Sequence, residues 1–448
     1  MSIKVLKFGG TSVGSPGALR LAASIIRKEL PRGGVVVVSA LSGTTDHILK
    51  AVSLAGKGGT NGALEVLGAI EVRHRTAADA LGLSRGVEEA WAPLFDRLQS
   101  LLEGMGLLWE TSPKAKDAAL AIGESLSANL VTALLQAEGL PARLKDAREV
   151  MRTDARHGRA RPRPDLIRAA CVDWKPLLAQ GACLVTQGFI GACPDGSTTT
   201  LGRGGSDTSA TLIGEALDAE EVQIWTDVDG VLTADPSLVP GARPIPVMSL
   251  REAAALSAFG AKVLHADSLA PVERGGFRLV VANTHRPEAS RTEILTEVAG
   301  RNGALITSVA YKEGLVGIHF PPARDLDAVF QAASDLQDAG AVRYGLLCTP
   351  EGSLLAVRPE HPDAEDLIAR LQASGLRVDT GLSSVALVGE GLRREPGKAL
   401  ALLSSLETEA LGGILAGGAG ISVAFLVPDE RLRDLIPHLH RLFIETKG

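Results

Sequence analysis

Cysteine and aromatic residues are scarce in this sequence. It contains four Cys, four Trp, two Tyr and nine Phe among 448 residues. The cysteines form no CxxC pair and have no histidine at metal-ligand spacing; they are Cys171, Cys183, Cys193 and Cys348. This pattern disfavours a disulfide framework and a zinc site, so we expect buried, reduced thiols.

The chain also lacks an excess of basic residues and long apolar runs. Its 46 Lys and Arg are outnumbered by 52 Asp and Glu, and the formal charge is -6 at pH 7. Nucleic acid or an anionic membrane surface would favour a basic patch, so we expect neither as a partner. The start, MSIKVLKF, lacks the apolar core of a signal peptide, and we find no stretch of about eighteen apolar residues to span a bilayer. A cytoplasmic protein is expected.

The apolar residues that are present suffice for more than one core. Hydrophobic residues make up 45% of the chain, and 448 residues exceed the usual size of one domain. Through roughly the first 280 residues, amphipathic segments separate short valine-rich runs; these are IKVLKF, GVVVVSA, ACLVTQGFI, EVQIWTDV and FRLVVANT. The alternation predicts a parallel sheet covered by helices. Residues 61–139 lack such a run and predict a helical subdomain.

The pattern changes after residues 291–303, where proline, glycine and polar residues cluster and where we place a domain boundary. Next, ALITSVAYKEGLVGIHF predicts two short strands, DLDAVFQAASDLQDAG a helix and GSLLAVRP another strand. A similar order returns in SSVALVGEGLRREPGKALALLSSLETE and GISVAFLVPDERLRDLIPHLHRLF. Two divergent β-α-β-rich units of about 70 residues therefore fill the C-terminal third.

The segment KVLKFGGTSVG near the N-terminus has the pattern of an anion site. Its lysine precedes the glycines, unlike the lysine of a Walker A loop. Gly9 and Gly10 allow backbone N–H groups to approach an anion, and Lys7 adds a positive charge. Thr11 or Ser12 can cap the following helix. The alternative is a turn between a strand and a helix with no ligand.

A second glycine-rich segment, TTTLGRGGSDTSATLIGEAL, precedes another apolar helix. Arg203 stands between glycines, where a guanidinium suits bidentate recognition of a carboxylate or phosphate. Ser206 or Asp207 can cap the helix, and capping alone is the alternative role for Asp207. Two such loops in one domain predict a substrate with more than one anionic group.

Two further segments place polar residues beside apolar runs. WTDVDGVLTADP leaves a strand at Thr226 and Asp227 and then turns, and carboxylates at the carboxyl end of a strand lie where open α/β sheets bind ligands. Capping and turning are the alternative. FGAKVLHADSL places Lys262 after a glycine, where a solvated surface lysine is the alternative.

The segment DAALAIGESLSANLVTALLQAEG predicts a helix with two faces. The large apolar face comprises Ile122, Leu126, Leu130, Ala133 and Leu134. The other face is small and nearly neutral apart from Glu124; its other members are Ala121, Ser125, Ala128 and Thr132. A carboxylate among small residues suits close packing against a polar ligand, and an exposed helix carboxylate is the alternative.

In their order and approximate spacing, these segments resemble the aspartate kinases of the amino acid kinase superfamily. The matching blocks are KFGGTSVG, VVVVSALSGTTD, TTTLGRGGSDTSA, WTDVDGVLTADP, ARPIP and FGAKVLH. The resemblance implies an α/β fold, with a three-layer αβα kinase domain and a mainly parallel sheet over residues 1–295. Within it, residues from about 190 to 295 would bind the nucleotide. Residues 304–448 would form two ferredoxin-like (ACT) units.

The resemblance also implies roles for individual residues. Those at the ATP site would be Lys7, Phe8, Gly9, Gly10, Thr226, Asp227, Asp235, Lys262 and Val263. Those at the L-aspartate site would be Ser39, Thr45, Glu124 and Arg203. Glu124 would meet the amino group and Arg203 the α-carboxylate. Lys7 and Asp207 would act in catalysis, with Lys7 on the transferred phosphoryl group and Asp207 close to the ammonium.

The implied activity is transfer of the ATP γ-phosphoryl group to the β-carboxylate of L-aspartate, with Mg²⁺ bridging phosphate oxygens. The products would be ADP and 4-phospho-L-aspartate, the first intermediate toward lysine, threonine and methionine. Because an aspartate side chain with a pKa of about 3.9 is ionised at pH 7, the attack needs no general base. Positioning and charge neutralisation would then carry catalysis. The resemblance further implies a homodimer paired through its ACT units, with lysine or threonine as a candidate effector.

The chain departs from the family pattern at several positions. Leu232 and Ser237 replace a tyrosine and an arginine that related enzymes often have, and Ala266 replaces a proline. The ACT-like segments FPPARDLDAVFQAASDLQDAGAVRYG and ILAGGAGISVAFLV also differ, which predicts altered or lost effector binding. Two alternatives stay open: a sister kinase acting on glutamate or acetylglutamate, and an amino-acid sensor whose kinase domain has decayed.

Overall fold

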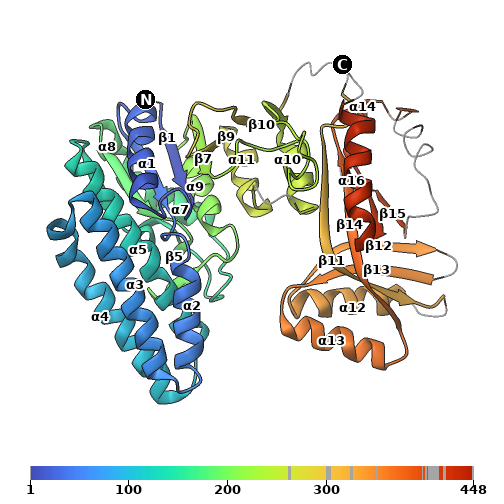
Figure 1. Ribbon diagram of the computed structural model, residues 1–448, viewed down its shortest axis with the longest axis horizontal. Helices are drawn as coiled ribbons and strands as arrows, with labels where there is room; N and C mark the ends of the chain where they lie inside the picture. Colours follow the sequence, from blue (N-terminus) through green and yellow to red (C-terminus); the bar gives the residue numbers. More distant parts are fainter. Residues whose placement is uncertain are drawn as a thin grey trace. The chain divides into compact units, whose positions relative to one another are not determined.

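The computed structural model describes residues 2–260, 264–298, 304–322, 326–349, 352–395, 397–398, 401, 413–416 and 420–445. The chain divides into two compact units (Figure 1). The first comprises Met1–Val231 and Leu264–Thr296, and the second Leu232–Val263 and Glu297–Gly448. Each unit has its own hydrophobic core.

The first unit is built on a mainly parallel sheet, as predicted. Its strands lie in the order β3-β4-β2-β1-β7-β9-β10. Neighbours from β3 to β9 are parallel, and β10 runs antiparallel to β9. The strands are β1 (Lys4–Phe8), β2 (Gly34–Val38), β3 (Ala142–Lys145), β4 (Cys183–Gln187), β7 (Glu221–Thr226), β9 (Arg278–Asn283) and β10 (Thr292–Leu295). A separate hairpin pairs β5 (Ile190–Ala192) with β6 (Thr198–Thr200).

The helices of this unit confirm the predicted helical subdomain. Figure 1 shows the long helices α2 to α5 side by side, with α5 next to the sheet. The helices are α1 (Pro16–Glu29), α2 (Thr44–Ala55), α3 (Thr60–Leu81), α4 (Ser84–Leu108), α5 (Pro113–Ala137), α6 (Ala147–Val150), α7 (Pro164–Ala170), α8 (Lys175–Ala179), α9 (Gly205–Ala216) and α11 (Ala270–Gly275). Ser15 caps α1 through its side chain, so neither Thr11 nor Ser12 performs that predicted role.

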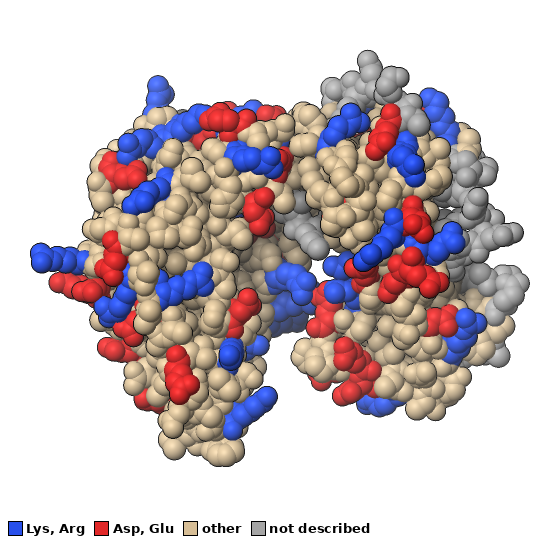
Figure 2. Space-filling view, in the orientation of Figure 1, with Lys and Arg blue, Asp and Glu red and all other residues tan. Residues whose placement is uncertain are grey.

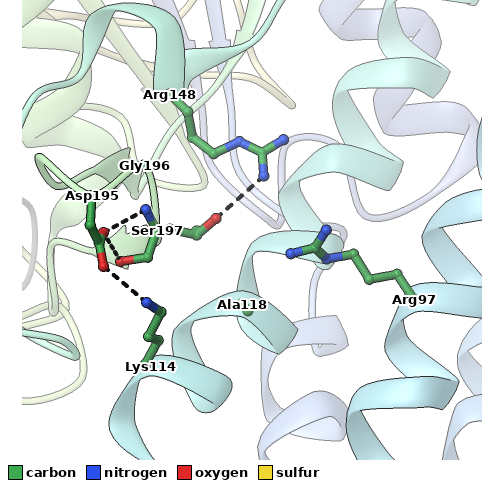
Figure 3. Close-up of a pocket in the computed structure, with 8 residues that line it drawn as sticks. Arg97, Lys114, Ala118, Arg148, Asp195, Gly196 and Ser197 are labelled. Atoms are coloured by element: carbon green, nitrogen blue, oxygen red, sulfur yellow. Dashed lines mark hydrogen bonds and ion pairs between the residues drawn. The ribbon is translucent and has the colours of Figure 1, made fainter.

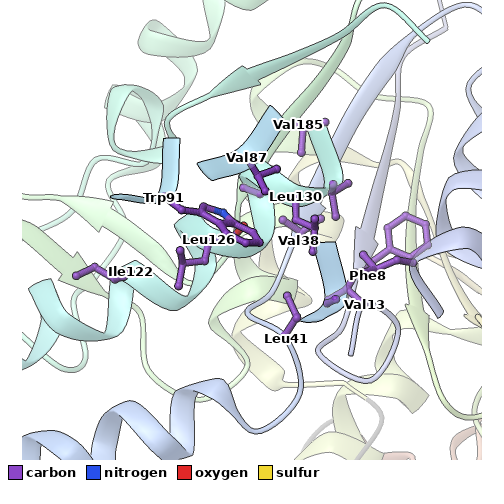
Figure 4. Packing of buried hydrophobic residues seen from close by; sticks show 14 of the residues in the cluster. Phe8, Val13, Val38, Leu41, Val87, Trp91, Ile122, Leu126, Leu130 and Val185 are labelled. Carbon is purple, nitrogen blue, oxygen red and sulfur yellow. The ribbon is translucent and has the colours of Figure 1, made fainter. Parts of the chain in front are cut away.

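One core joins α5 to the sheet and to the helical subdomain. Phe8 and Val38 from the strands lie in the same buried cluster as Leu130 from α5 (Figure 4). Trp91 of α4 belongs to this cluster, and its indole N–H donates to the carbonyl of Leu126 at 3.1 Å. This packing fixes α5 at one position along the sheet, which matters because α5 carries Glu124.

Helix α5 corrects one sequence expectation. By length and composition it is apolar enough to cross a membrane, with a mean hydropathy of 1.5 over its most apolar 18 residues. However, 83% of that window is buried inside the protein. Its burial extends around the helix and includes Asp117 and Glu124, so the predicted face of small residues is packed inside the protein like the large apolar face. The helix is apolar because it is a core element.

The second unit contains a six-stranded sheet in the order β12-β13-β11-β14-β16-β15. Its strands are β11 (Ser308–Phe320), β12 (Ala341–Thr349), β13 (Gly352–Pro359), β14 (Arg377–Val388), β15 (Gly413–Ala416) and β16 (Ser422–Pro428). A further strand, β8, spans Val247–Ser249, and the helices are α10 (Leu250–Ala258), α12 (Leu326–Asp338), α13 (Pro362–Ala373), α14 (Gly391–Arg394) and α16 (Leu432–His440).

The two predicted C-terminal repeats share this one sheet. The segment predicted as two short strands is one strand, β11, whose register against β14 shifts between Lys312 and Leu315. On one side of the shift, Val309 packs in a core with Phe425 and Leu439; on the other, Ile318 packs in a second core with Leu336. A local change in register therefore lets one long strand serve two α+β units.

The distribution of surface charge and the burial of the cysteines agree with what the composition predicts. On the face shown in Figure 2, acidic and basic side chains lie side by side on each unit. Cys171, Cys183 and Cys193 are free and buried, as predicted. Burial raises the pKa of Cys171 and of Cys183 to about 12. The side chain of Cys348 lies outside the described residues.

Candidate active site

The first glycine-rich loop follows β1 and packs closely on two neighbouring segments. The backbone N–H of Gly9 and the hydroxyl of Ser12 both donate to the carbonyl of Trp225 at 3.1 Å. A side chain on Gly10 would place its Cβ 3.1 Å from the Ala40 carbonyl oxygen. Glycine therefore permits this close approach, and the loop is held between the ends of β2 and β7.

The second glycine-rich loop meets the first through an ion pair. The ammonium nitrogen of Lys7 lies 2.5 Å from Oδ1 of Asp207, and both side chains are only 10% and 14% exposed. Asp207 lies in the first turn of α9, whose N-cap is Gly204. The predicted capping role of Ser206 or Asp207 is therefore wrong. The Lys7 and Asp207 side chains, both predicted as catalytic, are in contact.

The segment after β2 joins the same site. The hydroxyl of Ser39 donates to the hydroxyl of Ser206 at 3.1 Å, so this segment contacts the start of α9. Thr45 lies in the first turn of α2 and is half-buried. The structure thus brings Lys7, Ser39 and Asp207 to the carboxyl ends of neighbouring parallel strands, where open α/β sheets bind ligands.

Glu124 is a buried carboxylate directed at this segment. Its Oε1 accepts a hydrogen bond from the Ala40 backbone N–H at 3.4 Å, whereas its Oε2 is buried without a partner in the described part of the chain. Burial raises the pKa of Glu124 to about 7, although the backbone hydrogen bonds oppose this shift. The exposed alternative for Glu124 is excluded. A buried carboxylate oxygen without a donor is suited to receive the ammonium group of a ligand.

Arg203 lies in the second loop between two glycines with positive φ. Gly202 has φ of 79° and Gly204 has φ of 70°, a backbone that favours glycine. A Cβ on Gly204 would also lie 2.3 Å from that of His265. Arg203 is exposed, and no hydrogen bond or ion pair of its side chain is found in the described ranges. Its guanidinium is therefore available to a ligand.

The predicted nucleotide residues are divided between the two units. Thr226 ends β7, and its hydroxyl donates to Asp227 at 3.2 Å. Asp235 lies in the second unit, where it accepts hydrogen bonds from Ser237 and, at 3.2 Å, from the hydroxyl of Tyr311. Lys262 and Val263 lie outside the described residues.

Several site residues were missed from the sequence. The side-chain amide of Asn283 donates to the carbonyl of Asp227 at 3.3 Å and to the carboxylate of Asp229 at 2.7 Å. The hydroxyl of Thr284 donates to Ser12 at 2.7 Å and so ties β9 to the first loop. Their position directly after the FRLVVA run was the available signal, because the carboxyl ends of parallel strands meet at one edge.

A separate pocket of about 420 Å³ opens near the start of α5 (Figure 3). Arg97, Lys114 and Arg148 line it together with Ala118 and residues 195–198. Lys114 pairs with Asp195 at 3.0 Å, and Arg148 pairs with Asp146. Two of its three cations are therefore already neutralised, and none of the predicted site residues lines it.

Comparison with known proteins agrees with this geometry. Residues 2–283 match the model of the amino acid kinase family. The chain is 32% identical to lysine-sensitive aspartokinase 3 of Escherichia coli (strain K12), over 99% of both chains. Crystal structures of E. coli aspartokinase III share 31% identity: the complex with aspartate and ADP has a TM-score of 0.84 over 98% of this chain and 99% of that one. The complex with lysine and aspartate has a TM-score of 0.82 over 99% of both. The chain therefore belongs to the amino acid kinase family and, within it, to the aspartokinases.

Proposed function

We propose that this enzyme transfers the γ-phosphoryl group of ATP to the β-carboxylate of L-aspartate. The observation that carries the proposal is the Lys7–Asp207 contact, which joins the two glycine-rich loops at the carboxyl edge of the sheet. A chain 31% identical over nearly its whole length binds aspartate and ADP. The products are 4-phospho-L-aspartate and ADP, and the reaction is the first step toward lysine, threonine and methionine, in the cytoplasm.

The acceptor side holds the amino acid by its two α-groups. Arg203 binds the α-carboxylate, because its guanidinium has no competing acid among the described residues and offers a bidentate fork. Glu124 accepts the ammonium, which supplies the donor that its buried Oε2 lacks. Ser39 and Thr45 flank the side chain of the substrate. With both α-groups fixed, the β-carboxylate is directed at the phosphoryl group, and an added methylene would misplace it.

The transfer step needs no proton. An oxygen of the ionised β-carboxylate attacks the γ-phosphorus, the bond from that phosphorus to the β–γ bridging oxygen breaks, and ADP leaves with the electron pair. Lys7 and the backbone N–H of Gly10 neutralise charge on the phosphoryl oxygens, while the Gly9 N–H holds the loop on the Trp225 carbonyl. Lys7 can exchange its contact with Asp207 for one with phosphate as ATP enters.

The nucleotide side comprises Phe8, Thr226 and Asp227 of the first unit. Mg²⁺ usually binds through one or two carboxylates plus substrate phosphates. The residues present fit this preference: Asp207 lies in the first turn of α9 and Asp227 directly follows β7, and no group of three His, Cys, Asp or Glu side chains that could hold a metal gathers among the described residues. Asp207 and Asp227 are the side chains that would hold the ion, and it would neutralise charge on the triphosphate.

The second unit pairs two copies of the chain into a homodimer. Three of its large apolar side chains are exposed on neighbouring elements: Leu326 is 49% and Phe330 53% exposed on α12, and Val342 is 39% exposed on β12. Strand β12 also lies at one end of the six-stranded order among the described strands, and a partner can cover such an edge. Light scattering should report a dimer for the full chain and a monomer for Phe330→Glu, with Val172→Glu in the first unit as the exposed control. A dimeric Phe330→Glu variant would refute this assembly.

ADP release with Mg-ATP tests the activity. Turnover should require L-aspartate, and L-glutamate or acetylglutamate should support at most a small fraction of it. Equal turnover with glutamate would favour a sister kinase, and no turnover would favour a sensor. Repeating the assay with lysine, with threonine and with both identifies any effector, since a related aspartokinase binds lysine.

A further inference from the structure

Asp117 of α5 is a fully buried carboxylate that joins three segments distant in sequence. The hydroxyl of Thr200 donates to its Oδ1 at 2.6 Å, and the Thr200 backbone N–H donates to its Oδ2 at 3.1 Å. The ring Nδ1 of His157 donates to Oδ2 at 3.0 Å, and the Gly158 N–H donates to both oxygens, at 2.9 and 3.1 Å. Donors therefore surround both oxygens of Asp117.

The segments that Asp117 holds, residues 157–160 and the end of β6, pack next to the second glycine-rich loop. Thr200 ends β6 and lies three positions before Arg203. Its carbonyl accepts from the Ala160 N–H at 2.9 Å, which fastens residues 157–160 to β6. A Cβ on Gly202 would lie 3.4 Å from the Gly158 carbonyl oxygen. The position of residues 157–160 and Thr200 therefore sets the path of the backbone that carries Arg203.

The same helix carries Glu124, seven residues after Asp117. Seven residues are about two turns, so the two carboxylates project from nearly the same side of α5, about 10.5 Å apart along its axis. Asp117 fastens α5 to the Arg203 loop, and Glu124 contacts the backbone of Ala40, next to Ser39. Helix α5 thus fixes the spacing between the second glycine-rich loop and the segment after β2.

We propose that Asp117 is a positioning residue for the amino-acid site: it sets the distance between Arg203 and Glu124, and through it the fit of the substrate's α-carboxylate and ammonium. This role rests on the proposed function. A carboxylate is required because an amide keeps one acceptor oxygen and turns two donor hydrogens toward groups that are themselves donors. Asparagine would therefore displace residues 157–158 or Thr200 without changing the size of the side chain.

Kinetics of Asp117→Asn separate this role from a purely structural one. With constants normalised to folded protein, KM for L-aspartate should rise at least about tenfold, while KM for ATP should stay within about twofold of wild type. Thr200→Val removes one donor and should give a smaller rise of the same kind, and Thr200→Ser, which keeps both donors, should match wild type. Ser127→Ala is the control on the same helix: its buried hydroxyl has no partner in the described residues, so both constants should stay unchanged.

Amide hydrogen exchange provides a readout that does not depend on which amino acid accepts the phosphoryl group. Asp117→Asn should speed amide exchange at residues 157–160 and 200–203. The positioning role is overturned if folded Asp117→Asn or Thr200→Val protein has the wild-type KM for aspartate, or if its KM values for aspartate and ATP rise equally. Unchanged amide exchange at residues 157–160 and 200–203 in Asp117→Asn would also overturn it. If the wild-type enzyme shows no turnover with aspartate, the proposed function is wrong. The exchange result then decides the role of Asp117 by itself.

Discussion

The Lys7 ammonium lies 2.5 Å from the Asp207 carboxylate, although the two residues are 200 positions apart. Lys7 lies in β1 just before the first glycine-rich loop, and Asp207 lies in the first turn of α9, after the second. A largely buried lysine is thus charge-compensated before any phosphate arrives, and a site built this way can exchange one anion for another.

Lys7→Met should lower kcat at least about a hundredfold and leave KM for aspartate nearly unchanged. The physical reason is that Lys7 meets the phosphoryl group most strongly as charge develops during transfer. Steady-state kinetics on folded protein measure this. A variant with wild-type kcat but lower thermal stability would show that the ion pair only supports the loops.

Arg203→Ala should raise KM for aspartate about 30- to 150-fold, the equivalent of about 2 to 3 kcal/mol for a charged hydrogen bond. Because Arg203 is exposed and has no partner in the described ranges, the melting temperature should not change. Arg203→Lys should recover little, since lysine lacks the planar fork. Unchanged aspartate saturation in Arg203→Ala would mean that the second loop binds another anion.

Glu124 should make stability and substrate binding respond to pH in opposite directions. Its folded pKa of about 7 exceeds the ordinary value of 4.5, so its stabilising contribution is full below pH 4.5 and is lost as pH rises through 7. The loss amounts to about 3 kcal/mol. Glu124→Gln should therefore be more stable than wild type at pH 8 by up to about 3 kcal/mol, with the difference vanishing near pH 4.5.

Urea unfolding followed by tryptophan fluorescence measures this difference in the first unit, which holds all four tryptophans. In the active enzyme, kcat/KM for aspartate should fall as pH drops below 7, because the ammonium needs the ionised carboxylate. A pH-independent difference in stability, or strong aspartate binding by Glu124→Gln, would contradict this role.

His74 should give the free energy of unfolding a pH dependence opposite in sign to that from Glu124. It is buried in the helical subdomain between Trp91 and Phe95, and burial lowers its pKa to about 4 from 6.5. Its stabilising contribution is present above pH 6.5 and is lost as pH falls through 4, by about 3 kcal/mol. His74→Leu should flatten the acid limb of the urea-unfolding profile, whereas His47→Gln, at an exposed position on α2, should not. Parallel profiles for His74→Leu and wild type would contradict this.

The main sheet and both glycine-rich loops were predictable because their signals are local. Valine-rich runs mark β1, β2, β4, β7 and β9, and a loop between a strand and a helix needs only its own residues to be recognised. The strands β3 and β10 were not predicted, since four-residue strands such as ARLK, with two exposed positions, carry no apolar run.

Contacts between residues that are distant in the chain could not be predicted from the sequence. Nothing in KAKDAAL distinguishes Asp117 from an exposed helix carboxylate, because its donors come from residues 157–158 and from Thr200. The burial of Glu124 likewise depends on how α5 packs against the segment after β2. A motif assigned Asp235 to the nucleotide site, but its hydrogen bond from Tyr311, 76 positions later, could not be predicted from the sequence.

Trapping of the product with hydroxylamine tests the central claim most directly, because an acyl phosphate reacts to form a hydroxamate whereas inorganic phosphate does not. With Mg-ATP and L-aspartate, we predict one hydroxamate for each ADP released, and at most a trace with L-glutamate. ADP release without hydroxamate, or equal hydroxamate from both amino acids, would contradict the account.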